Sequence, residues 1–478
     1  MTNRRAKIVC TIGPATSTPK HLKSLAEAGM DVARLNFSHG SHEEHGHVIT
    51  TIREIAAQVG RPLAILQDLQ GPKIRIGGFA SGSVVLAQGA KFEITTADIL
   101  GNENSVSTSY HALSHDVAIG DYILLSDGLL RLEVVEIRDD TVMCIVRDGG
   151  VLHSRAGMNI PAATLTTDCL TPKDLQDLNF GLSKDVDYVA LSFVRRAEDI
   201  ESLTAIISER GSTAGAIAKL EKPQAIENLD SIMTVSDAVM IARGDLGVEL
   251  MPERVPFVQK EIIRRAASHR IPVITATQML ESMTDHPQPT RAEASDVANA
   301  ILDGTDAVML SGETAVGKYP IESTRMMHRI VTEAETQCSD VSPIEQKRRN
   351  RDTSVSYDIA IAQAASRVAG EIKAAALIAL TKTGFTARLM SKQRPRTPIF
   401  AFVGDGAVTR QLCLYWGVEP RLAPDKGTLE EKIILVDNEL RLQGFVRAED
   451  ALVVVASQST HGKTNLIRIH TSGQPDTK

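Results

Sequence analysis

The sequence alternates between short apolar runs and helix-like segments, and this alternation limits the possible fold more than any other feature. Apolar runs rich in Val, Ile and Ala, bounded by Gly or by charge, are typical of buried parallel strands. The expected strands span 7–12, 32–37, 63–67, 188–193, 216–218, 237–241, 272–276 and 307–310. Helical segments are expected near 198–209, 224–233, 253–268, 292–302 and 322–336. Eight such units predict an α/β fold, a closed (β/α)₈ TIM barrel.

Two helix starts carry the same signal, which supports the prediction of strand-then-helix units at both places. Thr18-Pro19 and Thr171-Pro172 each place a hydroxyl at the N-cap and a proline at the first helical position. Gly29 and Gly181 are expected to end these two helices, because glycine adopts the left-handed conformation at a helix C-terminus.

The pattern changes after the third expected strand. Residues 72–166 contain short strand-like runs that meet turns at Asp127-Gly128 and Asp139-Asp140, and such turns indicate hairpins. We therefore expect a small antiparallel β domain, a β-barrel, inserted after the third strand and called the lid below. The polar run 339–353 indicates a solvated linker, and the pattern over 354–472 predicts a separate α/β region. The expected domains are the barrel (1–71 and 167–343), the lid (72–166) and a C-terminal α/β domain (344–478).

Composition excludes several classes of function. The chain of 478 residues has a net charge of −7 with dispersed basic residues, so we expect no nucleic-acid partner. No apolar run approaches the length of about 20 residues that a membrane helix needs. The five cysteines (10, 144, 169, 338 and 413) show neither metal-ligand spacing nor a disulfide framework, which predicts reduced thiols and a cytoplasmic location.

Charged residues stand at the ends of two neighbouring expected strands. Lys219 and Glu221 follow one strand, and Arg243 and Asp245 follow the next. Charge at the end of a buried strand is costly unless it faces a polar cleft or a metal. Two such carboxylates could hold Mg²⁺ through oxygen ligands, and the Lys219 ammonium would share the face of Glu221. The alternative is two structural ion pairs.

The barrel prediction favours a site, because active sites of TIM barrels lie at the C-terminal ends of the strands. Many polar residues stand at or just past these ends: Asn36, Ser38, Asp68, Lys219, Glu221, Asp245, Thr277, Ser311 and Glu313. Structural ion pairs would have no reason to gather on one rim. In the C-terminal region, the loop 381–386 follows a strand and precedes a helix, which suits a phosphate, although an ordinary strand–helix turn fits as well.

Several longer motifs resemble pyruvate kinase, with near full-length similarity to its bacterial type. They are Ile8–Pro14 (IVCTIGP), Arg34–Gly40 (RLNFSHG), Ala242–Gly247 (ARGDLG), Ala276–Met283 (ATQMLESM) and Met309–Thr314 (MLSGET). The resemblance implies phosphoryl transfer from phosphoenolpyruvate to ADP, giving pyruvate and ATP in glycolysis. It also implies two Mg²⁺ per turnover, one of them brought by the nucleotide, and a homotetramer.

The resemblance also implies roles for individual residues. Glu221 and Asp245 would ligate Mg²⁺, and Lys219 would bridge the moving phosphoryl group and the enolate oxygen. Arg34 would hold the phosphate, while the backbone at Gly244 and the Thr277 side chain would hold the substrate carboxylate. Thr277, Ser311 and Glu313 would lie on the proton path to the enolate. The nucleotide contacts would come from the run Asn36, Phe37, Ser38 and His39, together with Arg75.

This chain departs from the family pattern in the loop 68–73. Many members hold K⁺ with the equivalents of Asn36, Ser38 and Asp68 and the carbonyl of Leu69, and their loop reads Asp-Thr-Lys-Gly-Pro-Glu. Here Lys73 replaces the glutamate. An ammonium is a compact cation, so we predict that Lys73 supplies the charge of K⁺ and that turnover does not need K⁺. The alternative is an exposed lysine at the lid hinge.

Two further regions depart from the family or vary within it. The paired lysines of the lid are Arg155-Ala156 here, so that Arg155 is the remaining candidate for a nucleotide-phosphate contact. In regulated members, the loop Thr381, Lys382, Thr383, Gly384, Phe385 and Thr386 corresponds to a sugar-phosphate site, to which Lys463 would add charge. A sugar-phosphate or nucleotide effector is therefore expected there.

Two other functions fit part of the pattern. A Mg²⁺-dependent pyruvate aldolase on the same barrel would explain Glu221 and Asp245, but not Arg75, the lid or the C-terminal domain. A catalytically dead regulatory homologue would need a broken site, whereas Lys219, Glu221, Asp245, Arg34 and Thr277 are all present. A requirement for ADP distinguishes the first alternative, and loss of all turnover identifies the second.

Overall fold

The fold is described from a computed structural model that covers the chain except residues 1–3, 162–165, 338–355, 425, 458–463 and 475–478. Eight parallel strands close into a barrel in the order β1-β16-β15-β14-β13-β12-β3-β2. Their bounds are β1 (Lys7–Ile12), β2 (Val32–Asn36), β3 (Ala64–Asp68), β12 (Tyr188–Leu191), β13 (Gly215–Leu220), β14 (Ala238–Ala242), β15 (Val273–Ala276) and β16 (Ala307–Leu310). The predicted TIM barrel is confirmed.

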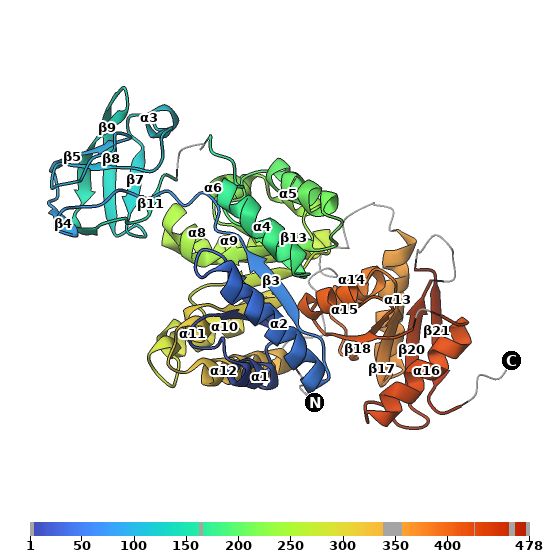
Figure 1. The fold of residues 1–478 in the computed structure, drawn as a ribbon. Coiled ribbons are helices and arrows are strands. Elements are labelled where there is room, and N and C mark those ends of the chain that lie inside the picture. Colours follow the sequence, from blue (N-terminus) through green and yellow to red (C-terminus); the bar gives the residue numbers. More distant parts are fainter. Residues whose placement is uncertain (1–3, 162–165, 338–355, 425, 458–463, 475–478) are drawn as a thin grey trace.

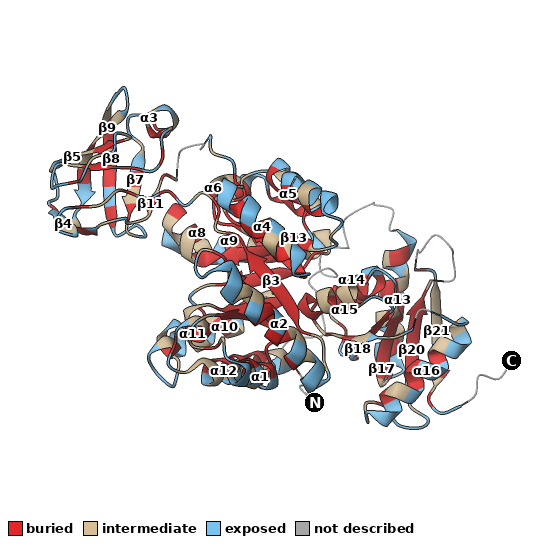
Figure 2. Ribbon diagram, viewed as in Figure 1, coloured by how far each residue is buried: buried red, intermediate tan, exposed pale blue. Residues whose placement is uncertain are grey.

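Helices surround these strands and bury their apolar faces against them. They are α1 (Pro19–Ala28), α2 (His42–Val59), α4 (Pro172–Ser183), α5 (Ala197–Glu209), α6 (Pro223–Glu227), α7 (Leu229–Val235), α8 (Arg243–Glu249), α9 (Val255–His269), α10 (Arg291–Asp303), α11 (Gly312–Ala315) and α12 (Pro320–Gln337), with the 3₁₀ turns η1 (Pro252–Arg254) and η2 (Glu281–Thr284). Figure 2 shows the buried barrel strands inside this ring. The expected helix 224–233 is two helices, α6 and α7, which meet at Asn228.

Both helix starts are confirmed, but only one of the two predicted ends. Thr18 accepts a hydrogen bond from the His21 N–H, and Gly29 ends α1 in the left-handed conformation. Thr171 caps α4, which continues past Gly181 to Ser183. Gly181 serves close packing instead, because a Cβ built on it would lie 2.1 Å from Oε1 of the buried Gln67.

The lid is a β domain inserted after β3, as predicted, and its strand pairs are antiparallel except for β5 and β6, which are parallel. A six-stranded sheet has the order β11-β7-β8-β9-β5-β6, and β10 pairs with β4. The bounds are β4 (Ser83–Leu86), β5 (Lys91–Thr95), β6 (Ser105–Ser107), α3 (Leu113–Asp116), β7 (Tyr122–Leu125), β8 (Leu130–Arg138), β9 (Thr141–Asp148), β10 (Gly150–His153) and β11 (Met158–Asn159). The lid and the C-terminal domain lie on opposite sides of the barrel (Figure 1).

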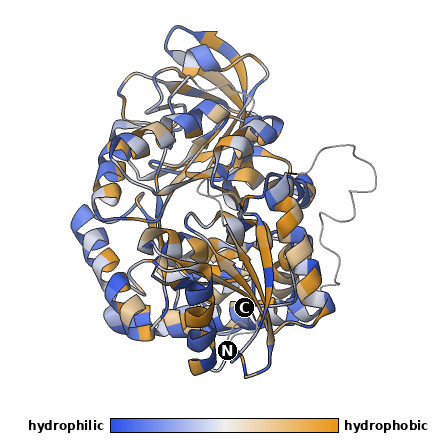
Figure 3. Ribbon diagram, turned by 90° about the vertical axis from the view of Figure 1, so that its right-hand side faces the viewer, coloured by the Kyte–Doolittle hydropathy of each residue, from blue (hydrophilic) through white to orange (hydrophobic). Residues whose placement is uncertain are grey.

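The C-terminal domain is a five-stranded sheet, order β19-β18-β17-β20-β21, with β21 antiparallel to β20. The elements are α13 (Tyr357–Glu371), β17 (Ala376–Leu380), α14 (Phe385–Ser391), β18 (Ile399–Val403), α15 (Gly406–Gln411), η4 (Leu412–Leu414), β19 (Val418–Leu422), α16 (Leu429–Leu442), β20 (Ala451–Ala456) and β21 (Leu466–Thr471). The hydrophobic residues concentrate on its strands (Figure 3). β19, α16 and β21 were not predicted from the sequence.

The C-terminal domain packs against the N-terminal end of the barrel, away from the predicted site. Leu414 and Cys413 join the apolar cluster that fills the barrel interior. Lys392 of the C-terminal domain forms a buried ion pair with Asp306, with 2.5 Å between Nζ and Oδ2. The opposite, C-terminal ends of the barrel strands therefore face the lid. Among the described residues, none of the helices combines the length and the apolarity needed to cross a bilayer.

Candidate active site at the barrel rim

Four charged side chains form a continuous chain at the C-terminal ends of β2, β3 and β13. Arg34 Nε donates to Asp68 Oδ2 at 2.7 Å, and the other oxygen of Asp68 lies 3.2 Å from Lys219 Nζ. Lys219 Nζ also lies 2.9 Å from Glu221 Oε1. The side chains of Asp68 and Glu221 are each 1% exposed, so these ion pairs are buried. Lys219 and Glu221 share a face, as the alternation of side chains along a strand predicts.

The pKa values of these groups follow from burial and from their partners. Burial raises the pKa of Asp68, but Lys219 and Arg34 outweigh it, and the net pKa lies below the ordinary value. Burial lowers the pKa of Lys219, but Asp68 and Glu221 outweigh it, and the net pKa lies above the ordinary value. Lys219 is therefore a fixed ammonium at neutral pH. The pKa of Glu221 is raised by burial and by the nearby charge of Asp245, against the effect of Lys219.

The oxygen atoms of Glu221 and Asp245 suit a divalent metal. Glu221 Oε2 accepts from the Phe193 N–H at 2.8 Å, and Lys219 is the partner of Oε1 among the described residues. Asp245 lies in the first turn of α8 and lines a pocket between the barrel and the lid. The described residues contain no group of three or more His, Cys, Asp or Glu side chains placed to hold a metal. A metal on this pair would need further oxygen ligands from outside the chain, and hard cations such as Mg²⁺ accept them readily.

Thr277 stands in a loop that the structure holds in a strained conformation. Thr277 and Gln278 have positive φ angles of 66° and 55°. Thr277 Oγ1 accepts from the Gly244 N–H at 2.8 Å, which joins the loop after β15 to the start of α8. Arg243 fixes this loop, because its Nη2 donates to the carbonyl of Thr277 at 2.6 Å and its Nη1 to Asp296 at 2.6 Å. Arg243 thus pairs with Asp296 and not with Asp245.

Ser311 and Glu313 stand just past β16, and Glu313 is fully engaged by the backbone. Its two oxygens accept from the N–H groups of Ser311 at 2.6 Å and of Leu280 at 3.0 Å. Burial raises the pKa of Glu313. Ser311 Oγ is buried and has no hydrogen-bond partner among the described residues. The geometry therefore gives Glu313 a positioning contact and leaves the Ser311 hydroxyl available.

The residues predicted to contact a nucleotide come from two places that no described contact joins. Asn36 Oδ1 accepts from the Ser38 N–H at 3.2 Å, and His39 is exposed. The Phe37 ring stacks on His45, with 4.1 Å between the ring centroids. In the lid, Arg75 and Arg155 are exposed, and Arg75 Nη1 donates to the Arg155 carbonyl at 3.0 Å. A ligand between the barrel and the lid would have to bring these two groups together.

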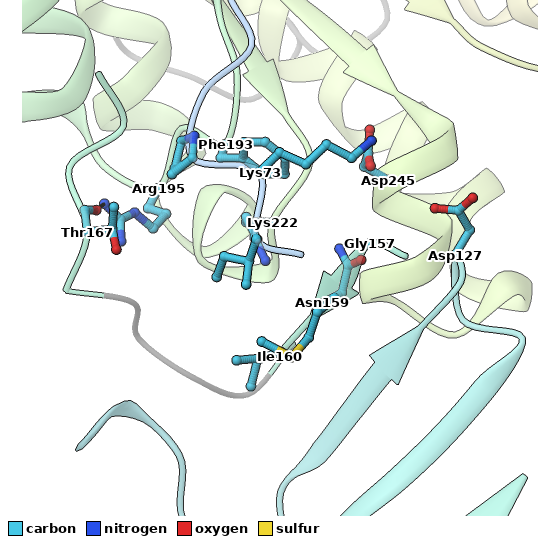
Figure 4. Close-up of a pocket in the computed structure, with 13 residues that line it drawn as sticks. Lys73, Asp127, Gly157, Asn159, Ile160, Thr167, Phe193, Arg195, Lys222 and Asp245 are labelled. Atoms are coloured by element: carbon cyan, nitrogen blue, oxygen red, sulfur yellow. Dashed lines mark hydrogen bonds between the residues drawn. The ribbon is translucent and has the colours of Figure 1, made fainter. Parts of the chain in front are cut away.

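Lys73 lies in the pocket between the lid and the barrel, and its side chain extends toward Asp245 (Figure 4). No contact described in the structure joins Lys73 to Asn36, Ser38 or Asp68. Instead, Asp68 is paired with Arg34 and Lys219, and the Leu69 carbonyl accepts from the Ser192 hydroxyl at 2.7 Å. The prediction that Lys73 acts as a built-in cation stays a prediction, with its side chain in the pocket that Asp245 lines.

The predicted effector loop starts a short helix in the C-terminal domain. Gly384 has a φ of 76° and is the N-cap of α14. Lys382, Thr383 and Phe385 are exposed, while the Thr386 hydroxyl is buried and lies 2.7 Å from that of Thr464. Lys463 lies outside the described residues.

Two residues that support the site were not predicted from the sequence. Ser192 accepts a hydrogen bond from Lys219 Nζ at 2.7 Å and donates to the Leu69 carbonyl, which ties the lysine to the end of β3. Arg243 was noted only as a charge at a strand end, and not as the residue that holds the Thr277 loop. Ser192 fell inside the expected strand 188–193, whereas β12 ends at Leu191, so the signal of a hydroxyl directly after a strand was missed. Nothing in the sequence pointed to the partners of Arg243.

Comparison with known proteins agrees with this geometry. The family pattern described as "Pyruvate kinase, barrel domain" matches residues 3–324, and "Pyruvate kinase, alpha/beta domain" matches residues 359–470. The chain is 44% identical to a pyruvate kinase from Mycobacterium intracellulare, over 99% of this chain and 100% of that protein. It is 46% identical to pyruvate kinase 2 from Synechocystis, over 98% of this chain and 79% of that protein.

A solved structure shows the same fold over nearly the whole chain. The crystal structure of a pyruvate kinase from Cryptosporidium parvum superposes with a TM-score of 0.94 at 37% identity, and the match covers 98% of this chain and 97% of that one. The two family patterns, the relatives and this structure agree with each other and with the motifs at the rim. The chain belongs to the pyruvate kinase family.

Proposed function

We propose that this chain transfers the phosphoryl group of phosphoenolpyruvate to ADP, giving pyruvate and ATP. The observation that carries the proposal is the buried chain Arg34–Asp68–Lys219–Glu221 at the rim of a barrel of this family. A phosphoryl group in flight spreads negative charge over its oxygens, and catalysis consists mainly of positioning and of cations placed in advance. Arg34 and Lys219 are two such cations, and Asp68 fixes both.

The residues take the following parts in this reaction. Arg34 uses Nε for Asp68 and Nη1 for the Thr11 hydroxyl, at 2.7 and 2.9 Å, which leaves Nη2 to hold the phosphate. The Lys219 ammonium neutralises charge on the transferred group and on the enolate oxygen. The substrate carboxylate lies against the start of α8 at Gly244 and against Thr277. The nucleotide contacts Asn36, Phe37, Ser38, His39 and Arg75, with Arg155 in place of the missing lid lysine.

Mg²⁺ is the cofactor that fits this site, with Glu221 and Asp245 as its protein ligands and a second ion arriving with the nucleotide. Bound there, the ion would supply Lewis-acid stabilisation of the phosphate and enolate oxygens. Thr277 and Ser311 supply hydroxyls for the proton that the enolate takes up, and Glu313 positions the Ser311 backbone. The lid excludes water, so that phosphoenolpyruvate is not simply hydrolysed.

The test of the proposed function is pyruvate formation from phosphoenolpyruvate with Mg²⁺, measured with and without ADP. We expect pyruvate and ATP in equal amounts, and no appreciable pyruvate when ADP is left out. Pyruvate release that does not depend on ADP would favour another enolate enzyme on this barrel. Absence of turnover, also in the presence of sugar phosphates and nucleotides, would favour a catalytically dead homologue.

We further propose that turnover does not need K⁺, because Lys73 places an ammonium in the pocket between lid and barrel that Asp245 also lines. In buffer free of K⁺ and Na⁺ we expect full activity. Lys73→Glu restores the residue that K⁺-dependent relatives carry, so this variant should lose about 10²-fold in kcat without K⁺ and recover when K⁺ is added. Lys91→Glu makes the same substitution at an exposed lysine of the lid. It should change kcat neither without K⁺ nor with K⁺. Wild-type activity that appears only with K⁺ would contradict the prediction.

Three further expectations concern regulation and assembly. A phosphorylated effector, a sugar phosphate or a nucleotide, would bind at the loop 381–386, where exposed Lys382 and Thr383 precede α14. A homotetramer is expected from the family. A cytoplasmic location agrees with the cysteines, since the four that the structure describes are free and buried, and burial raises the pKa of Cys10 to about 12.

A further inference from the structure

We propose that Glu249 is a positioning residue that fixes the lid over the metal-binding carboxylates, an inference that rests on the proposed phosphoryl transfer. Asn159, in the last strand of the lid, donates from Nδ2 to Glu249 Oε1 at 2.8 Å. The same oxygen accepts from Lys222 Nζ of the barrel at 2.5 Å. One carboxylate oxygen therefore joins the lid to the barrel, and the three residues together are called the latch below.

The two barrel residues of the latch are next to the proposed metal ligands in the chain. Lys222 directly follows Glu221 at the end of β13. Glu249 ends α8, four residues after Asp245, so both side chains lie on the same side of that helix. A change in the position of the lid would therefore act directly on the two elements that carry the carboxylates.

Other contacts show that α8 is the surface on which the lid rests. A Cβ built on Gly128, in the turn between β7 and β8, would lie 3.5 Å from Val248 of α8. The two linkers of the lid are joined to each other, because the Met158 N–H donates to the Ile74 carbonyl at 3.0 Å and Gly157 bridges to Arg75. Asn159 follows this joint immediately. The latch thus lies at the base of the lid, beside the place where its two linkers are held together.

The burial of Glu249 favours the observed position of the lid over one turned away from α8. The side chain is 1% exposed, and its Oε2 has no hydrogen-bond partner among the described residues. Burying a carboxylate is costly, and the cost is offset only by the donors that remain on it. A lid turned away from α8 would remove the Asn159 donor from a carboxylate that is already poorly satisfied. The observed position of the lid is therefore favoured over others, and Asn159 and Lys222 of the latch line the pocket together with Asp245 (Figure 4).

An exchange of charge between the two partners tests the latch. Asn159→Asp sets two carboxylates against each other, and we expect kcat to fall about tenfold, since partners in direct contact couple strongly. The Michaelis constants should change much less, because the substrate contacts remain. Glu249→Gln alone should also lower kcat. The double variant Asn159→Asp/Glu249→Gln puts the amide and the carboxylate in exchanged positions and keeps a carboxylate near Lys222. We expect it to recover to within about threefold of the wild type.

Asn104→Asp is the matched control, because Asn104 is an exposed lid residue that is given the same new charge. This variant should behave as the wild type. A wild-type kcat in Asn159→Asp would overturn the latch, as would a double variant that shows only the product of the two single losses. Melting temperatures measured in parallel separate a loss of folding from a loss of positioning.

Hydrogen exchange separates failure of the latch from failure of the proposed function. If the wild type forms no pyruvate from phosphoenolpyruvate and ADP, the proposed function is wrong, and kcat can no longer be used to test the latch. Backbone exchange over residues 156–160 then decides the latch. Faster exchange in Asn159→Asp that returns to wild-type rates in the double variant supports the latch. Equal exchange rates in the wild type, Asn159→Asp and the double variant overturn the latch.

Discussion

Lys219→Met should abolish phosphoryl transfer, with a loss of about 10³-fold or more in kcat. The methionine is an unbranched side chain of nearly the same length, but it removes the ammonium that lies between Asp68 and Glu221, at 3.2 and 2.9 Å from their oxygens. The charge that develops on the phosphoryl group then has no compensating cation at that position. The coupled assay of pyruvate formation measures the loss, and binding of Mg²⁺ to the variant should be largely retained.

Two control variants distinguish the loss of the Lys219 ammonium from a loss of folding. Lys219→Met leaves two buried carboxylates without their shared partner, which destabilises the fold, so its melting temperature must be measured. Lys219→Arg keeps the charge but not its shape, and it should fold normally and still lose most of the rate. Lys23→Met removes an exposed lysine of α1 and should be silent. Unchanged turnover in Lys219→Met would contradict the role of Lys219.

The rate should not decline through deprotonation of Lys219 in the alkaline range below about pH 10. The sign follows from the direction of the shift. Burial alone would lower the pKa of this lysine, but Asp68 and Glu221 raise it above its ordinary value. A group whose pKa is raised keeps its proton to higher pH, so the ammonium persists beyond the ordinary pKa of a lysine. A pH profile of kcat for the wild type measures this.

Glu221→Gln should have the second-largest effect, a loss of about 10²- to 10³-fold in kcat that added Mg²⁺ restores only in part. The amide can still accept from the Phe193 N–H through its oxygen, as Glu221 Oε2 does at 2.8 Å, so the local fold is kept. What is lost is the negative charge that a divalent cation needs. A titration of activity with Mg²⁺ should show a much higher concentration for half-maximal rate.

Glu209→Gln is the matched control for this variant, since Glu209 is an exposed residue of α5. It should have the wild-type Mg²⁺ dependence. If Glu221→Gln also has the wild-type dependence, Glu221 is not a metal ligand, and Asp245 together with the substrate would have to hold the ion. The two variants of Lys219 and Glu221 remove the two ends of the same ion pair, so their effects should not add.

The sequence by itself determined the barrel, the inserted lid and the rim to which the candidate functional side chains belong. Strand positions follow from local apolar runs, and in a closed parallel barrel every strand ends on the same side. Knowing where each strand ends was therefore enough to collect Asp68, Lys219, Glu221 and Asp245 on one rim. The motifs supplied the family, which the spacing of charges alone could not have done.

The sequence was less successful where the local pattern does not carry the information. In β21, the polar residues Arg468 and His470 alternate with apolar ones, so the segment has no continuous apolar run. It is a strand because it pairs with β20 at the edge of the sheet. Gly181 looked like the end of a helix, and only its close approach to Gln67 explains why it is a glycine inside one.

Only the tertiary structure decided which partners the charged residues take. Arg243 precedes Asp245 by two residues, yet it pairs with Asp296 and holds the Thr277 loop. Glu249 binds Lys222 and Asn159, residues from the barrel and from the lid. A strand or helix follows from interactions between residues close in sequence, whereas an ion pair depends on where distant side chains are brought by packing. For this reason the sequence predicted which residues gather at the candidate site, and the fold determined how its parts are held together.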